Sequence, residues 1–393
     1  MDKEKSTKLA AKQDRAKTPK LKPTNPIEDA ITSWIPSLPA ELAVRTQAIA
    51  SELLKTAPKR WVVYPPMVLL PSGSFEGEAW MGVQHAARES IDEVWLKILT
   101  TVGRREGKGL LTHLAINNGI PLNYGGADEN ILRTPTGLRI LYGDFGPSLS
   151  PSAIPTSEHF EEAFWVSARQ NGITQIWAPR YTMFSRGNIK EKARILDFHH
   201  GTFGERKRGK ELLKEEAAID LYAGIGYFVF SYVKMGMSSV VGFELNPWSV
   251  EGLRRGALAN GWSIRVVKDG EEWNSDGEMI TIFQEDNAIA LKRSQGATGS
   301  WLRKITHVNC GLLPSSDGSW DTALGFLTRG GWLHLHENVG VNDIDTRKGA
   351  IEAILSKNQR LRETEVKVEH VELVKTFAPG VWHCVFDVYV ARR

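Results

Sequence analysis

The chain has 393 residues, which is too long for one compact core and indicates two or three globular domains. Its composition, with 41% hydrophobic and 24% charged residues and a net charge of +3, is ordinary for a globular protein. It has no apolar run of about 18 residues that would span a membrane, and no apolar signal-peptide core at its N-terminus. Its two cysteines, Cys310 and Cys384, exclude a disulfide scaffold and a four-cysteine zinc site and fit a reducing compartment, so we expect a cytoplasmic protein.

The chain begins with a basic segment. Residues 1–22 hold eight Lys or Arg against three acids, with few large apolar groups. This composition buries too little apolar surface to fold, so we expect a disordered basic tail over residues 1–24. The tail is either a solvated end of the chain or an arm that contacts RNA phosphates.

Residues 25–200 predict an N-terminal α+β region. Apolar residues at helical spacing, opened by Pro26, predict the first helical segment, and Pro65-Pro66 interrupt a strand-like run. The expected helices cover 25–57 and 88–99, and the expected strands cover 61–70, 173–184 and 193–198, with short strands and turns over 105–145.

A second basic stretch lies within the folded part. Residues 180–210 contain nine Lys or Arg and three acids. A basic stripe on a nearly neutral protein favours RNA as a partner, and His199-His200 would belong to the same basic surface. Trp177, beside this stretch, is a candidate for stacking on a splayed-out base.

From residue 216, strands alternate with helices. Strands are expected near 217–222, 239–244, 263–267, 281–284, 304–309, 331–336, 365–374 and 381–390, and helices over 226–236, 247–259, 317–328 and 344–358. The alternation predicts a parallel sheet wrapped on both faces. Pro379-Gly380 joins the last two strands without a helix and predicts an antiparallel hairpin. Residues 201–393 are therefore expected to form a Rossmann-like α/β domain of the class I methyltransferase type.

The strongest local motif is Asp220-Leu-Tyr-Ala-Gly224-Ile-Gly226-Tyr-Phe, an apolar strand that runs into a Gly-x-Gly turn and a helix. Glu244 ends the next strand, where a carboxylate can accept both ribose hydroxyls of an adenosine. A dinucleotide site would need a third glycine at Val229, and Asp220 suits a cationic ligand group. The pattern therefore favours S-adenosylmethionine over NAD.

Other polar positions carry two interpretations each. Asn246-Pro247 is typical of a helix cap. Asp286 and Asn287 follow a short apolar strand and would bind adenine, although Asp286 would also serve as a cap. His334 and His336 alternate on a strand as metal ligands would, but no third ligand is evident, so no metal is expected.

Asp220–Phe228 and Glu244–Pro247 resemble the group that contains the tRNA guanine N1-methyltransferases and the tRNA wybutosine-synthesising aminocarboxypropyltransferases. Residues 177–194, WAPRYTMFSRGNIKEKAR, are similar to the second branch almost residue for residue. Residues 112–117 and 141–147 resemble the middle domain that both branches share. The resemblance covers about residues 105–393 and implies that residues 105–200 support tRNA and cofactor binding.

The segment Asn309–Ser316 separates the two branches. The N1-methyltransferases carry an Asn-Pro-Pro-aromatic loop here, and this chain has NCGLLPSS instead. The resemblance therefore implies transfer of the 3-amino-3-carboxypropyl group of S-adenosylmethionine to C7 of 4-demethylwyosine in phenylalanine tRNA. Attack on Cγ in place of the methyl carbon would be selected by orientation.

The resemblance also implies roles for individual residues. Ser185 and Lys192 would contact the methionine portion, Glu244 the ribose, and Asp286 with Asn287 the adenine. Arg180, Arg186 and Arg194 would contact RNA, and no general base is assigned. The alternatives are a tRNA guanine N1-methyltransferase that uses the same cofactor, and a non-catalytic tRNA-binding protein.

Overall fold

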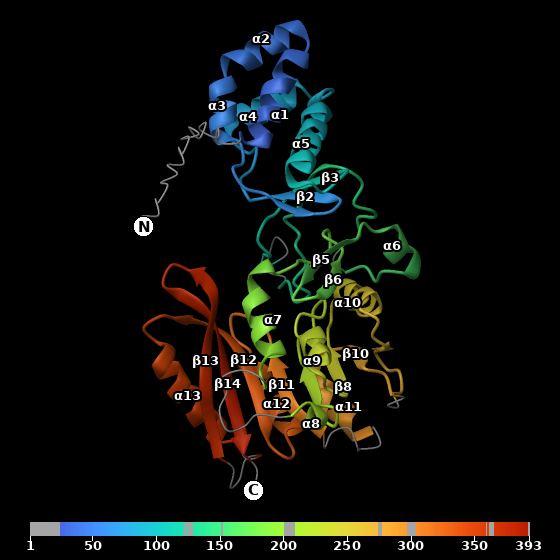
Figure 1. Ribbon diagram of the computed structural model, residues 1–393, viewed down its shortest axis with the longest axis vertical. Coiled ribbons are helices and arrows are strands. Elements are labelled where there is room, and N and C mark those ends of the chain that lie inside the picture. The colour runs from blue at the N-terminus through green and yellow to red at the C-terminus, as the bar shows by residue number, and fades with distance from the viewer. Residues whose placement is uncertain are drawn as a thin grey trace, which may run out of the picture. The chain divides into compact units, whose positions relative to one another are not determined.

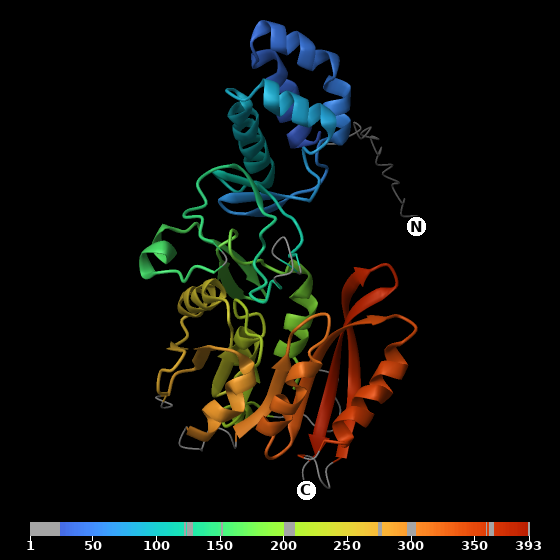
Figure 2. The same ribbon diagram turned by 180° about the vertical axis from the view of Figure 1, so that it is seen from behind.

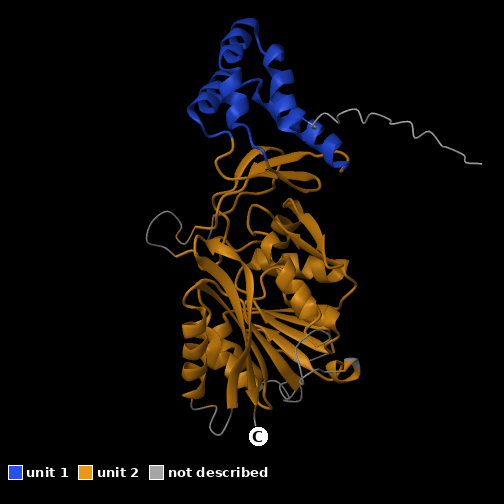
Figure 3. Cartoon of the chain, turned by 60° about the vertical axis from the view of Figure 1, so that its left-hand side comes forward, with its two compact units in different colours: residues 1–59, 75–107 blue, residues 60–74, 108–393 orange. Residues whose placement is uncertain are grey.

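The computed structural model describes residues 24–121, 123, 129–150, 152–199, 209–273, 277–296, 304–358, 360 and 365–391. The chain forms two compact units, residues 1–59 with 75–107 and residues 60–74 with 108–393 (Figure 3). Residues 1–23 of the predicted basic tail, which is expected to end at Thr24, lie outside the described residues. The predicted domain boundary between residues 200 and 201 also lies outside them, because residues 200–208 are not described.

The first unit is helical. Its helices are α1 (Pro26–Trp34), α2 (Ala40–Ala48), α3 (Ala50–Thr56), α4 (Glu78–Ala86) and α5 (Ile91–Glu106). The Asn25 side chain caps α1 by accepting from the backbone amide of Ile27, and Pro26 occupies the first turn. The predicted helical segment 25–57 is therefore three helices. The helix predicted to end at residue 99 continues to Glu106, where Gly107 adopts the left-handed conformation that ends helices.

Two small sheets begin the second unit. The first joins β1 (Val62–Tyr64), β2 (Met67–Leu70), β3 (His113–Ile116) and β4 (Arg139–Tyr142) in that order, and the second pairs β5 (Val166–Gln170) with β6 (Ile173–Trp177). The short helix α6 (Ser157–Glu162) precedes β5.

The strand predicted over residues 193–198 is wrong. These residues belong largely to helix α7 (Ile189–Leu196), which buries Glu191, Lys192 and Ile195. Buried positions one and four residues apart fit one face of a helix, and a six-residue window is too short to separate that period from a strand. The strand predicted over 173–184 stops at Trp177, where a turn begins at Ala178.

The main sheet has eight strands in the order β13-β14-β12-β11-β7-β8-β10-β9. Their bounds are β7 (Ala217–Asp220), β8 (Ser239–Phe243), β9 (Ile264–Lys268), β10 (Ile280–Gln284), β11 (Ile305–Cys310), β12 (Gly331–Gly340), β13 (Glu365–Ala378) and β14 (Val381–Ala391). All neighbours are parallel except that β14 runs antiparallel to both β12 and β13. The predicted mixed sheet with an antiparallel hairpin is confirmed (Figure 1).

Helices cover both faces of this sheet, as the alternation predicts. One apolar layer packs α12 (Trp320–Phe326) and α13 (Ile344–Ser356) against the sheet, and Figure 2 shows this side in front. The opposite layer packs α7, α9 (Val229–Met235) and α10 (Pro247–Ala259). The short helices α8 (Lys210–Leu213) and α11 (Ala290–Gly296) complete the unit. Within the described ranges, no helix is long and apolar enough to cross a bilayer.

Candidate cofactor site

A cavity of about 460 Å³ opens at the carboxyl ends of the parallel strands. Open α/β sheets bind ligands at this edge, because loops and helix amides converge there. The strand ends contribute Leu221, Tyr222, Phe243, Glu244, Leu245, Glu285, Asp286, Asn287, Gly311, Leu312, Leu313, His336 and His383 to the lining. The segment between β6 and α7 adds Thr182, Met183, Ser185 and Asn188.

The glycine loop adopts backbone conformations that side chains disfavour. Gly224 has φ +52° and Gly226 has φ +88°. A Cβ atom at position 226 would lie 2.7 Å from the ring of Phe230, so this position must remain glycine for α9 to pack. Gly224 lines the cavity, whereas Gly226 is not part of the lining.

Glu244 joins this loop to the next strand. Its carboxylate accepts hydrogen bonds from the backbone amides of Gly224 and Asn246, each at 2.8 Å. Burial raises the pKa of Glu244 to about 7. Two amides leave further lone pairs on the carboxylate, so the group can also accept ribose hydroxyls.

Asp286 and Asn287 lie at the β10 end of the cavity. The Asp286 side chain accepts from the backbone amide of Ala288 at 2.8 Å, so its predicted capping role is present. Asn287 donates from Nδ2 to the carbonyl oxygen of Leu221 at 2.7 Å, which fixes the orientation of its amide. Asn246 likewise caps α10 by accepting from Trp248, as predicted.

Asp220 ends β7, is fully buried and is not part of the cavity lining. Its Oδ1 accepts from the amide of Tyr222 at 3.1 Å and from Asn309 Nδ2 at 3.0 Å, and its Oδ2 has no partner among the described residues. Burial raises the pKa of this carboxyl to about 6. A buried carboxylate without a cation is suited to a cationic ligand nearby.

The two residues expected at the methionine portion occupy different places. Ser185 lines the cavity, and its Oγ accepts from Lys375 Nζ at 3.1 Å. Lys192 Nζ is buried and donates to Gln170 and Gln175 at 2.6 and 2.8 Å. Burial lowers the pKa of Lys192 to about 8. Lys192 is not part of the cavity lining, and its contact with a ligand stays a prediction.

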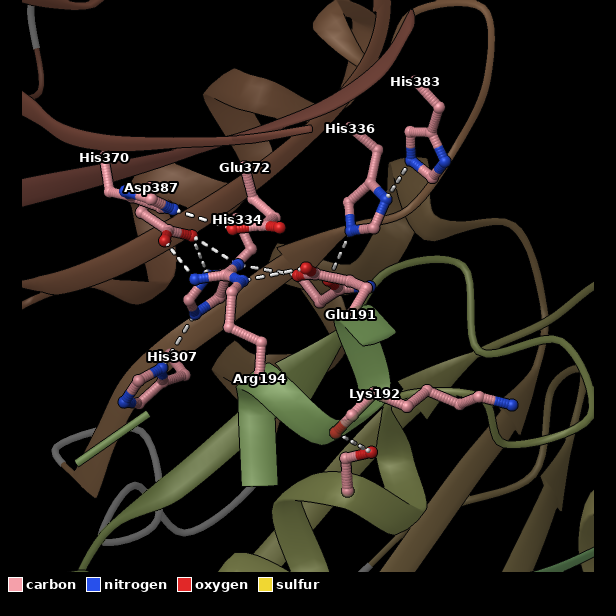
Figure 4. A network of polar contacts seen from close by, with 12 residues as sticks. Glu191, Lys192, Arg194, His307, His334, His336, His370, Glu372, His383 and Asp387 are labelled. Atoms are coloured by element: carbon pink, nitrogen blue, oxygen red, sulfur yellow. Dashed lines mark hydrogen bonds and ion pairs between the residues drawn. The ribbon is translucent and has the colours of Figure 1, made fainter. Parts of the chain in front are cut away.

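The three candidate RNA contacts also differ. Arg186 is exposed and Arg180 is half-buried. The Arg194 side chain is 12% exposed and forms ion pairs with Glu191 at 2.6 Å and Asp387 at 2.5 Å. Figure 4 shows Arg194 reaching from α7 toward Asp387, away from the direction that Lys192 takes. The RNA role of all three residues stays a prediction.

Two expectations about surface residues are wrong. Trp177 is buried and stacks on Phe184 with 4.6 Å between ring centroids, so it fills the core. His199 is buried and contacts His307 through the Nε2 atoms of both rings at 2.9 Å. His200 lies outside the described residues. The number of basic residues nearby in the sequence does not reveal that the side chains of Trp177 and His199 are buried.

Sequence reasoning missed a polar layer on one face of the sheet (Figure 4). His307 Nδ1 contacts His334 Nε2 at 2.9 Å, and His334 Nδ1 contacts Asp387 Oδ1 at 2.7 Å. Two residues along β12, His336 contacts His383 at 2.9 Å and Asn309 at 3.2 Å. In the described ranges, no three or more His, Cys, Asp or Glu side chains converge as metal ligands would.

A signal for this layer is present in the sequence. Polar residues recur at even spacing along three strands. His307 and Asn309 are two residues apart, as are His334 and His336, and His383 and Asp387 are four residues apart. Residues two or four apart share one face of a strand. Only the pairing register, which sets His334 opposite both Asn309 and Asp387, shows that the three sets meet.

No family model matches the chain. The Schizosaccharomyces pombe tRNA wybutosine-synthesizing protein 2 is 41% identical over 361 residues, which cover 88% of this chain and 78% of that protein. The Saccharomyces cerevisiae tRNA wybutosine-synthesizing protein 2 is 34% identical over 381 residues, with 86% and 76% covered. The crystal structure of P. horikoshii TYW2 in complex with MeSAdo has a TM-score of 0.57 and 17% identity, covers 93% of this chain and 100% of that one, and shows the shared fold.

Proposed function

Because the chain belongs to the tRNA wybutosine-synthesizing protein 2 family, we propose that it transfers the 3-amino-3-carboxypropyl group of S-adenosylmethionine to a tRNA base. The acceptor is C7 of 4-demethylwyosine at position 37 of phenylalanine tRNA, and the released product is methylthioadenosine. The observation that carries the proposal is the 41% identity to a wybutosine-synthesizing relative over 88% of the chain. The cavity at the sheet edge supplies the matching chemistry.

The cavity residues fit S-adenosylmethionine as the co-substrate. Glu244 is held by two backbone amides with lone pairs left for the ribose hydroxyls. Asp286 and Asn287 face the adenine, and Gly224 lets the backbone approach the ligand. Gly226 allows α9 to pack against the turn, and the negative charge of Asp220 favours the positive charge of the ligand. S-Adenosylmethionine supplies a sulfonium that activates three carbons, of which Cγ must lie in line with the nucleophile for this product.

The remaining assignments follow the same proposal. Ser185 lies on the cavity wall and binds the methionine portion. Lys192, which lies on α7 outside the cavity lining of the ligand-free chain, contacts the methionine carboxylate. Arg180 and Arg186 contact phenylalanine tRNA, whereas the guanidinium of Arg194 is bound to Glu191 and Asp387. The enzyme acts in the cytoplasm without an obligate protein partner or a metal.

The test incubates the full chain with phenylalanine tRNA bearing 4-demethylwyosine and S-adenosylmethionine labelled in the methionine chain. We expect label in the tRNA and release of methylthioadenosine. Unlabelled tRNA with adenosylhomocysteine released would instead indicate an N1-methyltransferase. Binding of tRNA with neither product would indicate a non-catalytic tRNA-binding protein.

A further inference from the structure

The two ends of the cavity carry different chemistry. Glu244, Asp286 and Asn287 follow β8 and β10, whereas His336 and His383 lie on β12 and β14, beyond β7 and β11 in the strand order. With adenosine at the β8–β10 end, the reacting carbon and the acceptor base must lie toward the β12–β14 end. His383 is therefore on the reacting side of the cavity wall.

Hydrogen bonds determine where the protons of the histidine pair lie. Asn309 donates from Nδ2 to Asp220, which leaves its Oδ1 as an acceptor for His336 Nε2–H. A neutral His336 then has a bare Nδ1, which can only accept from His383 Nε2–H. His383 is left with a bare Nδ1, and that atom has no hydrogen-bond partner among the described residues.

Both rings are neutral near pH 7. Burial, together with the positive charge of Lys375, lowers the pKa of His383 to about 4. Burial, with the positive charges of Arg194 and Lys375, holds the pKa of His336 well below its usual range. The lone pair on His383 Nδ1 is therefore not consumed by protonation near pH 7. The atom itself is buried in the ligand-free chain, and the ring that carries it lines the cavity.

We propose that His383 is the proton acceptor of the transfer reaction, and that Asp220, Asn309 and His336 position it by fixing its tautomer. The proposal rests on the proposed function. The bond from C7 to Cγ forms while the bond from sulfur to Cγ breaks, and that electron pair stays on sulfur in methylthioadenosine. The C7–H bonding pair returns to the ring as the proton moves to His383 Nδ1, and the imidazolium then releases this proton to water.

A weak base suffices for this step. After a neutral ring carbon attacks, the tRNA nucleobase carries a positive charge until C7 loses its proton. The proton on C7 is therefore strongly acidic. Asp220 Oδ2 is an unpartnered buried carboxylate oxygen among the described residues, but Asp220 is not part of the cavity lining. Asn188 lines the cavity and has an unpartnered Oδ1, but an amide oxygen is too weak a base to take the proton. His336 lines the cavity, but both of its nitrogens are already bonded.

The kinetic test compares H383Q with H370Q, a half-buried histidine on β13 that contacts Glu372 outside the cavity. Glutamine at position 383 keeps a donor for His336 and removes the basic nitrogen. We expect transfer to slow by roughly 100- to 10,000-fold in H383Q, with unchanged affinity for S-adenosylmethionine and wild-type rates in H370Q. With tRNA deuterated at C7, H383Q should show a larger isotope effect on transfer than the wild type, because proton loss becomes limiting.

Three results would overturn the assignment: a wild-type rate in H383Q, a slow H383Q without a larger isotope effect, or a matching loss of cofactor affinity. A wild-type enzyme that transfers no aminocarboxypropyl group would refute the proposed function itself. A second measurement needs no variant activity: ¹⁵N NMR of the histidine rings should find His336 and His383 both protonated at Nε2. A proton on His383 Nδ1 would contradict the proposal.

Discussion

Two polar networks meet strand β12 two residues apart, and they differ in how they end. The His334 network runs from His307 to Asp387, which forms an ion pair with Arg194 from α7. The His336 network runs from Asp220 through Asn309 to His383 and reaches the cavity. In the first, both His334 nitrogens and both Asp387 oxygens have partners. In the second, Asp220 Oδ2 and His383 Nδ1 have none among the described residues.

The two networks differ because a cation, Arg194, pairs with the carboxylate of the His334 network, whereas no described cation pairs with the carboxylate of the His336 network. Burial alone would raise the pKa of Asp387, but Arg194 and His334 outweigh burial and lower it. Asp220 and Glu244 pair with no described cation, and burial raises their pKa values to about 6 and about 7. The paired network stabilises the docking of α7 on the sheet, whereas the unpaired one leaves charge and lone pairs for a ligand.

The largest expected effect comes from breaking the paired network. We expect D387N to lower the free energy of unfolding by about 3–5 kcal/mol, because Arg194 loses one of its two buried carboxylate partners and His334 loses its acceptor. Since the pKa of Asp387 is lowered in the folded state, its contribution is present at neutral pH and is lost as pH falls below about 4. Urea unfolding at pH 7 and pH 3.5 measures this. R186Q, at an exposed arginine, is the control, and an equal loss in both variants would contradict the assignment.

The next effect concerns the cavity carboxylate. E244Q should weaken S-adenosylmethionine binding by roughly 10- to 100-fold, because a charged acceptor for hydroxyl groups is replaced by a neutral one. Since ionised Glu244 is the better acceptor, wild-type affinity should rise with pH up to about 7 and then level off. E244Q should lose that part of the pH dependence, and calorimetric titration from pH 5.5 to 8.5 measures it. An exposed carboxylate changed in E272Q should leave both affinity and slope unaltered.

A third prediction sharpens the contrast, because the same substitution should have the opposite sign in the two networks. D220N should raise the stability of the ligand-free protein at pH 8 by on the order of 1 kcal/mol, since it removes a buried carboxylate without a cation. The pKa of Asp220 is raised on folding, so wild-type stability falls as pH rises from about 4 to about 6. The gain from D220N should therefore vanish near pH 4. If D220N instead lowered the stability at pH 8, the negative charge of the buried Asp220 carboxylate would be balanced by other groups in the folded protein, and this prediction would be wrong.

Local sequence signals predicted most of the sheet domain. Gly224, Gly226 and Glu244 occupy the positions expected from a strand, a tight turn and the end of the next strand. These features depend on residues within about one strand–helix unit, where hydrophobic period and turn chemistry carry the information. The strand prediction over residues 193–198 was wrong because the apolar residues of this short segment fit both the helical and the strand period.

The histidine layer depends on long-range register instead. His307, His334 and Asp387 lie on three strands separated by whole helices, and their contacts follow from which residues of β11, β12 and β14 face each other. The sequence showed His334 and His336 on one face and suggested a metal as one explanation. It contained no local signal that Asp387, paired with Arg194, would bind His334, or that His336 would line the cavity.

The smallest expected effect is on the stability of H383Q. Glutamine can still donate to His336, and the nitrogen that it removes has no partner to lose, so the free energy of unfolding should change by less than about 1 kcal/mol. The matched variant is H334Q, which cannot satisfy both His307 and Asp387 and should lose about 1–3 kcal/mol. Urea unfolding of both variants at pH 7 provides the comparison. Equal losses would mean that His383 is as structurally committed as His334, and the distinction between a paired network and a cavity-facing one would fail.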